Sequence, residues 1–174
     1  LHYYSLAEVP PELLMISGDT ALSEFEARAC LVARFGEDLR PRDCRQMAAA
    51  GMYLVRSLLG TEVDLLDPGS PSRLAEALCD RLDEEKLPVE EPLNMVILLG
   101  CLFGEMVRNR VKLESSWMAL RQIELWPAVV FSRKKATGSD SIVFSPMDHL
   151  RGLVGSRDRD ALRRAIEELK TVCG

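Results

Sequence analysis

The segment from Pro92 to Asn109 constrains the fold of this 174-residue chain more than any other. Residues 95–103 (MVILLGCLF) are apolar on all sides, which is typical of a helix buried on every face. The run is about half the roughly 20 residues that a membrane span needs, so we predict the central helix of a globular domain. Because glycine costs helix stability, we expect Gly100 and Gly104 to allow close packing against a neighbour.

Further helices are predicted on both sides of this central one. Their apolar residues recur at helical spacing, and two of them begin with a serine cap followed by proline, at Ser70-Pro71 and Ser145-Pro146. Gly155 is expected to end the helix that starts at Pro146. The predicted helices cover residues 21–35, 41–59, 70–82, 146–154 and 157–172.

The pattern changes to β-type between the central helix and the closing helices. Trp117–Trp126 alternates in part, and Ala128–Phe131 and Ser141–Phe144 are short β-type runs. Residues 133–140 between the last two are predicted to form an exposed hairpin loop. With two to four short antiparallel strands, the predicted fold class is α+β and mostly helical, with a helical layer packed on a small antiparallel sheet.

Length and composition suit one domain over residues 1–174. We divide it into a helical N-terminal part, 1–91, and a second part, 92–174, with the central helix, the strands and the closing helices. Hydrophobic residues make up 47% of the chain and charged residues 28%, so a substantial core is expected. The chain begins at Leu1, which leaves open whether it is a fragment and whether residues 1–91 form an independent unit.

The five cysteines predict a reducing compartment. Their number is odd and no two are spaced as CxxC, so neither a disulfide framework nor a metal site is expected. Cys30, Cys79 and Cys101 lie in apolar helical patterns, which favours buried thiols that act as small hydrophobes. Residues 1–17 lack the basic start of a signal peptide, so we expect a cytoplasmic protein without a membrane span.

The net charge and the absence of known motifs argue against several functions. The net charge is −5, whereas nucleic-acid binders carry a basic face that neutralises phosphates. The chain contains no GxxxxGK[ST], no GxGxxG and no GxSxG, so phosphate cradling by a glycine loop and serine hydrolysis have no support. We expect no cofactor.

The second part of the chain, residues 92–172, resembles an uncharacterised bacterial domain of unknown function. In that pattern an apolar LGxxxGE helix precedes short strands that contain tryptophan and proline. The resemblance implies no assigned activity, but it suggests an accessory or immunity-type protein. The matching residues are Leu99, Gly100, Gly104, Glu105, Trp117, Pro127, Val129 and Pro146.

Two residues are weak candidates for catalysis. Glu105 follows the apolar helix core and could act as a buried acid or base, but a helical pair with Arg108 at i+3 is the favoured interpretation. His149 could form a dyad with a cysteine, yet no cysteine lies in a recognisable nucleophile setting. A surface or capping role for His149 is favoured, and no catalytic residue is assigned.

Five residues are candidates for binding. Trp117 and Trp126 lie nine positions apart, so a regular strand would place them on opposite faces. One of them would then be exposed as part of a binding face, or covered by the N-terminal helices. Arg133, Lys134 and Lys135 form a basic hairpin tip, for which a solvated loop that protects a strand edge is the simpler explanation.

The leading hypothesis is a non-enzymatic protein–protein interaction module, in its concrete form a bacterial accessory or immunity-type protein. Its partner would be another protein, whose identity the sequence does not give, and the oligomeric state stays open. One alternative is a small enzyme with an unrecognised site around His149 and Glu105. Another is a weak nucleic-acid contact through the basic hairpin and the arginines of residues 157–164.

Overall fold

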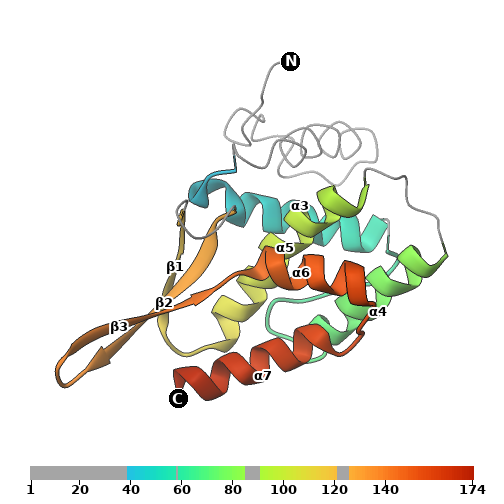
Figure 1. Cartoon of the computed structure of the whole chain (residues 1–174). Coiled ribbons are helices and arrows are strands. Elements are labelled where there is room, and N and C mark those ends of the chain that lie inside the picture. The colour runs from blue at the N-terminus through green and yellow to red at the C-terminus, as the bar shows by residue number, and fades with distance from the viewer. Residues whose placement is uncertain (1–38, 58, 85–90, 121–125) are drawn as a thin grey trace.

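The computed structural model describes residues 39–57, 59–84, 91–120 and 126–174 (Figure 1). In these residues it contains five α-helices and one three-stranded antiparallel sheet, which confirms the predicted α+β, mostly helical fold class. The predicted helix over residues 21–35, and Cys30 in it, lie outside the described residues.

The elements follow one another much as the sequence predicts. The helices α4 and α5 begin and end within one residue of the predicted bounds. A short 3-10 helix, η3, precedes α3. In chain order the elements are η3 (Pro41–Asp43), α3 (Cys44–Ser57), α4 (Ser70–Asp83), α5 (Glu91–Arg110), β1 (Glu114–Met118), β2 (Ala128–Lys135), β3 (Gly138–Phe144), α6 (Pro146–Ser156) and α7 (Ala161–Cys173).

Helix α5 is the centre of the molecule, as its all-round apolar sequence predicts. All residues from 96 to 107 are buried, and α5 packs between α3 and α6 (Figure 1). Contact with α3 is close because a Cβ on Gly51 would lie 2.8 Å from the carbonyl oxygen of Leu98. Among the described residues, no helix combines the length and apolar character required to cross a membrane.

The two glycines of α5 are explained by neighbours that leave no room for a side chain. A Cβ on Gly100 would lie 2.9 Å from Cγ of Met147, in α6. A Cβ on Gly104 would lie 2.3 Å from Cη2 of Trp117, in β1, and 3.0 Å from Cγ of Pro146. The prediction of close packing at both glycines is confirmed, and residues that the sequence places far apart therefore meet on one side of α5.

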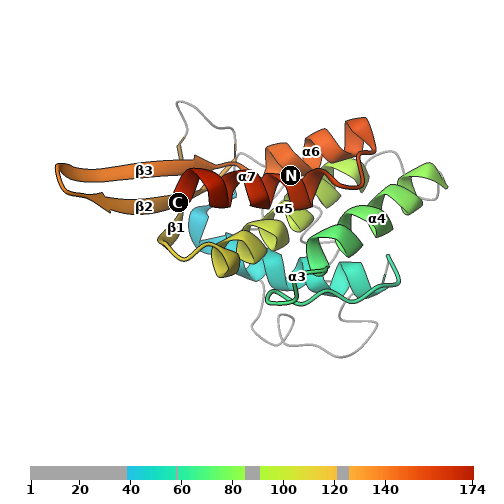
Figure 2. The ribbon, with the colours of Figure 1, turned by 90° about the horizontal axis from the view of Figure 1, so that it is seen from below.

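The sheet has the strand order β1-β2-β3, and its last two strands form a hairpin that projects beyond the helices (Figures 1 and 2). Pairing runs from Val129↔Phe144 to Lys135↔Gly138. The predicted loop over residues 133–140 is therefore wrong, because only residues 136 and 137 separate the strands. Gly138, with φ of 138°, and cross-strand ion pairs to Asp140 allow the ladder to continue further than composition suggests.

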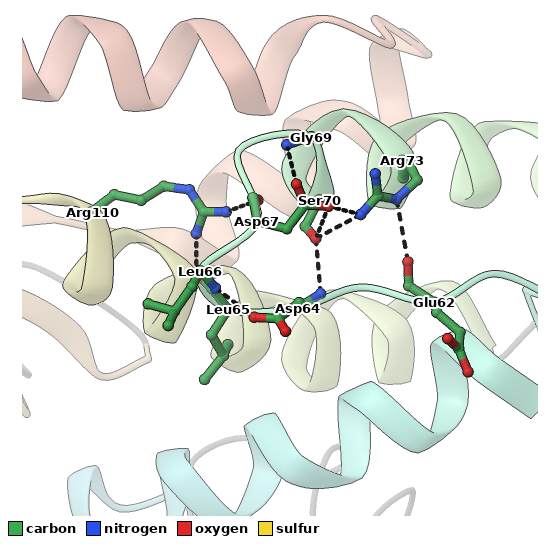
Figure 3. Close-up of polar contacts among 9 residues, drawn as sticks. All are labelled: Glu62, Asp64, Leu65, Leu66, Asp67, Gly69, Ser70, Arg73 and Arg110. Carbon is green, nitrogen blue, oxygen red and sulfur yellow. Dashed lines mark hydrogen bonds and ion pairs between the residues drawn. The ribbon is translucent and has the colours of Figure 1, made fainter.

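The second half of the loop between α3 and α4 is held by the side chains of Arg110 and Ser70 (Figure 3). Arg110 of α5 donates to the carbonyl oxygens of Leu65 and Asp67. The buried Ser70 accepts a hydrogen bond of 2.8 Å from the amide of Asp64. Ser70 thus begins α4 as predicted, but its hydroxyl does not cap that helix. Leu66, between these anchors, is 71% exposed.

The closing helices differ in detail from the prediction. Helix α6 passes the expected stop at Gly155 and ends at Ser156, because Arg157 adopts the left-handed conformation with φ of 58°. Its amide donates to the carbonyl oxygen of Leu153 at 2.8 Å, which closes the helix. The last helix begins only at Ala161, four residues later than predicted, after a turn in which Asp158 accepts from the amide of Asp160.

Candidate functional site

Glu105 is buried and fully engaged in structural contacts. Its Oε1 accepts hydrogen bonds of 2.9 Å from Nη1 of Arg108 and of 2.9 Å from Nε1 of Trp117. Nε of Arg45 lies 3.9 Å from the same oxygen. The favoured interpretation, a helical pair with Arg108, is confirmed. The guanidinium of Arg108 and the indole of Trp117 both donate to one carboxylate oxygen and fix its position. Glu105 is therefore suited to be a structural anchor.

Arg108 extends this anchor from α5 to the first strand. Its Nε donates to Oγ of Ser115 at 3.1 Å, and its Nη2 donates to the carbonyl oxygen of Ser115 at 3.2 Å. Together with the bond between Trp117 and Glu105, these contacts attach the end of α5 to β1. Three of the residues on which the resemblance depends are therefore in contact: Trp117 packs on Gly104 and donates a hydrogen bond to Glu105.

His149 lies in an aromatic stack. Its ring is 4.6 Å from that of Phe144 at an interplanar angle of 15°, and it meets Phe103 edge-on at 6.3 Å. Burial lowers the pKa of His149 below 6.5, against the smaller effects of Asp148 and Glu168. The imidazole therefore stays uncharged to a lower pH than a free histidine. His149 is half-buried, and its ring packs against aromatic rings, which the sequence did not predict.

The structure does not bring Glu105 and His149 together. His149 contacts Phe103, which precedes Glu105 by two residues in α5. Two residues correspond to about 200° around an α-helix, so the two side chains leave α5 on opposite sides. An acid–base pair formed by Glu105 and His149 is not supported by this placement.

The cysteines offer no activated nucleophile among the described residues. Cys44, Cys79, Cys101 and Cys173 are free and buried, which confirms the prediction of buried thiols for Cys79 and Cys101. Burial raises the pKa of Cys79 and Cys173, and it raises that of Cys101 further, helped by a hydrogen bond with Cys44. A protonated, buried thiol is a poor nucleophile. In the described ranges, no three His, Cys, Asp or Glu side chains are grouped to hold a metal ion.

Both tryptophans lie in the core. Trp117 and Trp126 are each 8% exposed, so of the two alternatives that the sequence left open, the exposure of one tryptophan is wrong. Trp117 lies on the inner face of the sheet, against Gly104, and Trp126 precedes β2. Arg151 covers the ring of Trp126 at 5.6 Å from its centroid. The argument from the odd separation fails because β1 ends at Met118, so the two residues do not share a strand.

The basic hairpin tip is partly neutralised. Asp140 lies 2.9 Å from Nη2 of Arg133 and 2.8 Å from Nζ of Lys135, and these cations hold the pKa of Asp140 down at about 2. Arg133 also donates to the carbonyl oxygen of Val172. Lys134, on the opposite face, is exposed and has no ion pair among the residues described.

The C-terminal arginines also pair with aspartates. Arg159 contacts Asp80 at 2.5 Å and Asp83 at 3.1 Å, which joins the start of the last helical segment to α4. The remaining pairs are Arg157 with Asp83, Arg163 with Asp160, and Arg164 with Asp158. Positive charge that is satisfied within the protein is not free to displace counterions from a phosphate backbone.

The outer face of the sheet is the best candidate for a functional surface. Alternation along the strands places Trp117, Val129 and Phe131 inward, where all three are buried. The other face carries Met118, 43% exposed, and Val143, 47% exposed. We call the surface formed by the following residues the outer sheet face: Ser116, Met118, Val130, Ser132, Lys134, Ser139, Ser141 and Val143.

Sequence reasoning missed Met118 and Val143. The signal was present in the alternation of residues 139–144, Ser-Asp-Ser-Ile-Val-Phe. Alternation places Val143 on the same face of the strand as Ser139 and Ser141, and Phe144 on the other face. In the pairing register, Ser116, Val130 and Val143 form one row across the three strands. Val130 is itself only 8% exposed, so the apolar patch on this face is formed by the exposed side chains of Met118 and Val143, with serines beside them.

The comparisons identify no relative. No family model, no curated protein and no solved structure matches this chain.

Proposed function

We propose that this chain is a protein–protein interaction module that contacts its partner with the outer sheet face. The observation that carries the proposal is the pair of exposed hydrophobic side chains, Met118 and Val143, on the outer face of a regular antiparallel sheet. An antiparallel sheet usually presents polar residues on its solvent face. Large apolar residues there contribute free energy when a partner covers them.

The projecting hairpin extends this surface beyond the helices. Beyond the pair Glu114↔Ser132, β2 has only β3 as a neighbour among the described strands, so the outer part of the hairpin stands as a two-stranded ribbon (Figure 2). Serine hydroxyls and Lys134 surround the apolar patch. Such a mixture of an apolar centre and a polar rim is typical of interfaces between proteins.

The concrete form of this proposal is an accessory or immunity-type protein of a bacterium, and it depends on the resemblance of residues 92–172. The alternative functions gain less from the geometry. Glu105 is held in an anchor, and the ring of His149 stacks on that of Phe144. Arg133 and Lys135 of the hairpin pair with Asp140, and Arg163 pairs with Asp160.

Photo-cross-linking in the lysate of the source organism tests the proposal. A photoreactive residue is placed at Val143, and a matched one at Glu76, an exposed position of α4. We expect a single protein to be cross-linked in stoichiometric yield from position 143 and not from position 76. The double variant Met118→Ser/Val143→Ser should fail to retain that protein. Equal products from both positions, or none from position 143, would refute the outer sheet face as the contact.

A shortened hairpin provides an independent test. Ser132 and Ser141 are partners in the register, so residues 133–140 can be replaced by Asn-Gly, which forms a two-residue hairpin turn. The shortened protein keeps Val130 and Val143. If the hairpin contributes reach, the partner should be bound more weakly, while circular dichroism stays that of a folded protein. Full retention of the partner would show that the ribbon takes no part.

A further inference from the structure

Strand β3 lies at an edge of the sheet and pairs with β2 only. Because just two residues separate Lys135 from its partner Gly138, this closing pair is a hydrogen-bonded one. Hydrogen-bonded and non-bonded pairs alternate along an antiparallel ladder. The backbone N–H and C=O groups of Ser139, Ser141 and Val143 therefore point away from β2. We call this row of groups the β3 edge.

The backbone groups of the β3 edge have no hydrogen-bond partner among the residues that the structure describes. Ser139, Ser141 and Val143 are all exposed, and the hairpin that carries them projects beyond the helices (Figures 1 and 2). From residue 139 to residue 143 the row is about 13 Å long, at the usual rise of a strand. Donors and acceptors therefore repeat along the β3 edge at the spacing of an extended chain.

The opposite edge of the sheet is closed in part. The same alternation turns the backbone of Ser115 in β1 away from β2, and Arg108 donates to its carbonyl oxygen at 3.2 Å. Proteins commonly protect a free edge with lysine, proline, a bulge or a charge. Strand β3 contains neither lysine nor proline, and its register has no bulge. Its one charged side chain, Asp140, is paired with cations of β2.

We propose that the partner contacts the β3 edge with an extended segment, which joins the sheet as a fourth strand. This inference rests on the proposed function and names how the partner is held. An extended backbone is the occupant whose own N–H and C=O groups match the row. Side chains opposite Val143 would lie on the outer sheet face, so the added strand enlarges its apolar surface. A second copy of the chain fits less well, because each copy carries a net charge of −5.

NMR on the purified full chain tests the β3 edge with two short peptides that alternate threonine and valine. The probe is N-methylated at its threonines and the control at its valines, so each can pair through one edge only. Valines should lie on the face of Val143, which turns their amides towards β3. We expect the probe to bind about tenfold more tightly than the control and to protect the amides of Ser139, Ser141 and Val143 from exchange.

Ser141→Pro tests the same edge from the side of the protein. The substitution removes one outward N–H and no bond to β2, and proline is tolerated in an edge strand where its nitrogen faces solvent. Ser141→Thr keeps the N–H and is the matched control. We expect Ser141→Pro to weaken binding of the probe by about tenfold and Ser141→Thr to leave it nearly unchanged, with both proteins folded by circular dichroism.

No change of the amide signals at millimolar probe, or equal binding of the two peptides, would overturn the proposal. Protection of the Ser141 amide that rises with protein concentration alone would make a second copy the occupant and would overturn it too. The protein cross-linked from position 143 separates this inference from the proposed function. If Ser141→Pro retains that protein as well as Ser141→Thr does, the β3 edge is refuted and the outer sheet face is not. If position 143 cross-links nothing while the probe binds as expected, the reverse holds.

Discussion

Gly104 shows how one missing side chain fixes the position of a strand against a helix. The ring of Trp117 occupies the place that a Cβ on Gly104 would need, and the indole nitrogen reaches Glu105 on the next position of the helix. The sequence pattern LGxxxGE therefore has a physical explanation that involves a residue more than ten positions away. From the sequence, close packing at Gly104 could be predicted, but not the identity of the neighbour.

Gly104→Ala should destabilise the protein by about 2 kcal/mol, because the added methyl group forces the Trp117 ring out of its place. Gly152→Ala in α6 is the control. No atom lies within 4 Å of its Cβ position, and alanine is the better helix former, so it should stabilise by about 0.5–1 kcal/mol. Urea unfolding measures both changes. Equal effects of the two substitutions would contradict the packing argument.

His149 makes the stability of the fold depend on pH. Its pKa in the folded protein lies below 6.5, so the unfolded chain takes up a proton at a higher pH than the folded one. The contribution of His149 is therefore complete above pH 6.5 and is lost as the pH falls from 6.5 through the folded value. Urea unfolding between pH 7.5 and pH 5 should show this loss.

His149→Phe keeps a ring against Phe144 and removes the titration. The slope of stability with pH in that interval should therefore be smaller in the variant. If the two proteins gave the same slope, the loss of stability would not come from His149, and this account would be wrong.

At the scale of elements, the contacts of Glu105 join α5 to β1. Glu105→Ala would leave Arg108 and the indole of Trp117 without their shared acceptor and should cost about 3 kcal/mol. Arg45→Ala is the control, since Arg45 lies 3.9 Å from Glu105 and its side chain is 78% exposed, and we expect a loss below about 0.5 kcal/mol. Thermal or urea unfolding would contradict the anchor if Glu105→Ala cost no more than the control.

The β2–β3 hairpin depends on Asp140 for its outer pairing. This carboxylate contacts both Arg133 and Lys135. In Asp140→Asn the pairs lose their charge, so the backbone amides at the outer end of the β2–β3 ladder should exchange with solvent faster. Asp148→Asn, which affects only the exposed pair with Arg151 on α6, should leave them unchanged. Hydrogen exchange followed by NMR measures both. Unchanged exchange in Asp140→Asn would show that the ladder needs no charge.

Local sequence signals predicted elements better than they predicted the surfaces that elements present. The serine–proline starts gave the beginnings of α4 and α6, and the apolar run gave α5. The extent of the hairpin was underestimated, because cross-strand pairs to Asp140 are contacts between positions that composition treats as a loop. The sequence did not decide which tryptophan is covered, since the environment of Trp117 is set by Gly104, on another element.

At the scale of the whole molecule, the positive charge of residues 157–164 is held in pairs with aspartates. Arg157, Arg159, Arg163 and Arg164 all contact aspartates. We therefore expect no retardation of DNA or RNA in gel-shift experiments at low salt. Asp158→Asn/Asp160→Asn frees Arg163 and Arg164 and should give weak binding that added salt abolishes. Retardation by the unchanged protein would contradict this account.

The outer sheet face belongs to this largest scale, which is why the sequence did not reveal it. It combines residues of three strands. Alternation places Val143 on one face of its own strand, but the fact that Met118 shares this face depends on how the strands pair.

The close contact of Gly51 with Leu98 has a consequence for the modularity of the chain. The resemblance noted in the sequence begins at residue 92, yet α5 packs against α3, which lies before that point. A gene segment that encoded only residues 92–174 would specify a central helix with one apolar side unpaired. Recombination could therefore transplant this half of the protein only together with a helix that takes the place of α3, and insertion or fusion would be tolerated better at the hairpin turn, residues 136 and 137, than at residue 91.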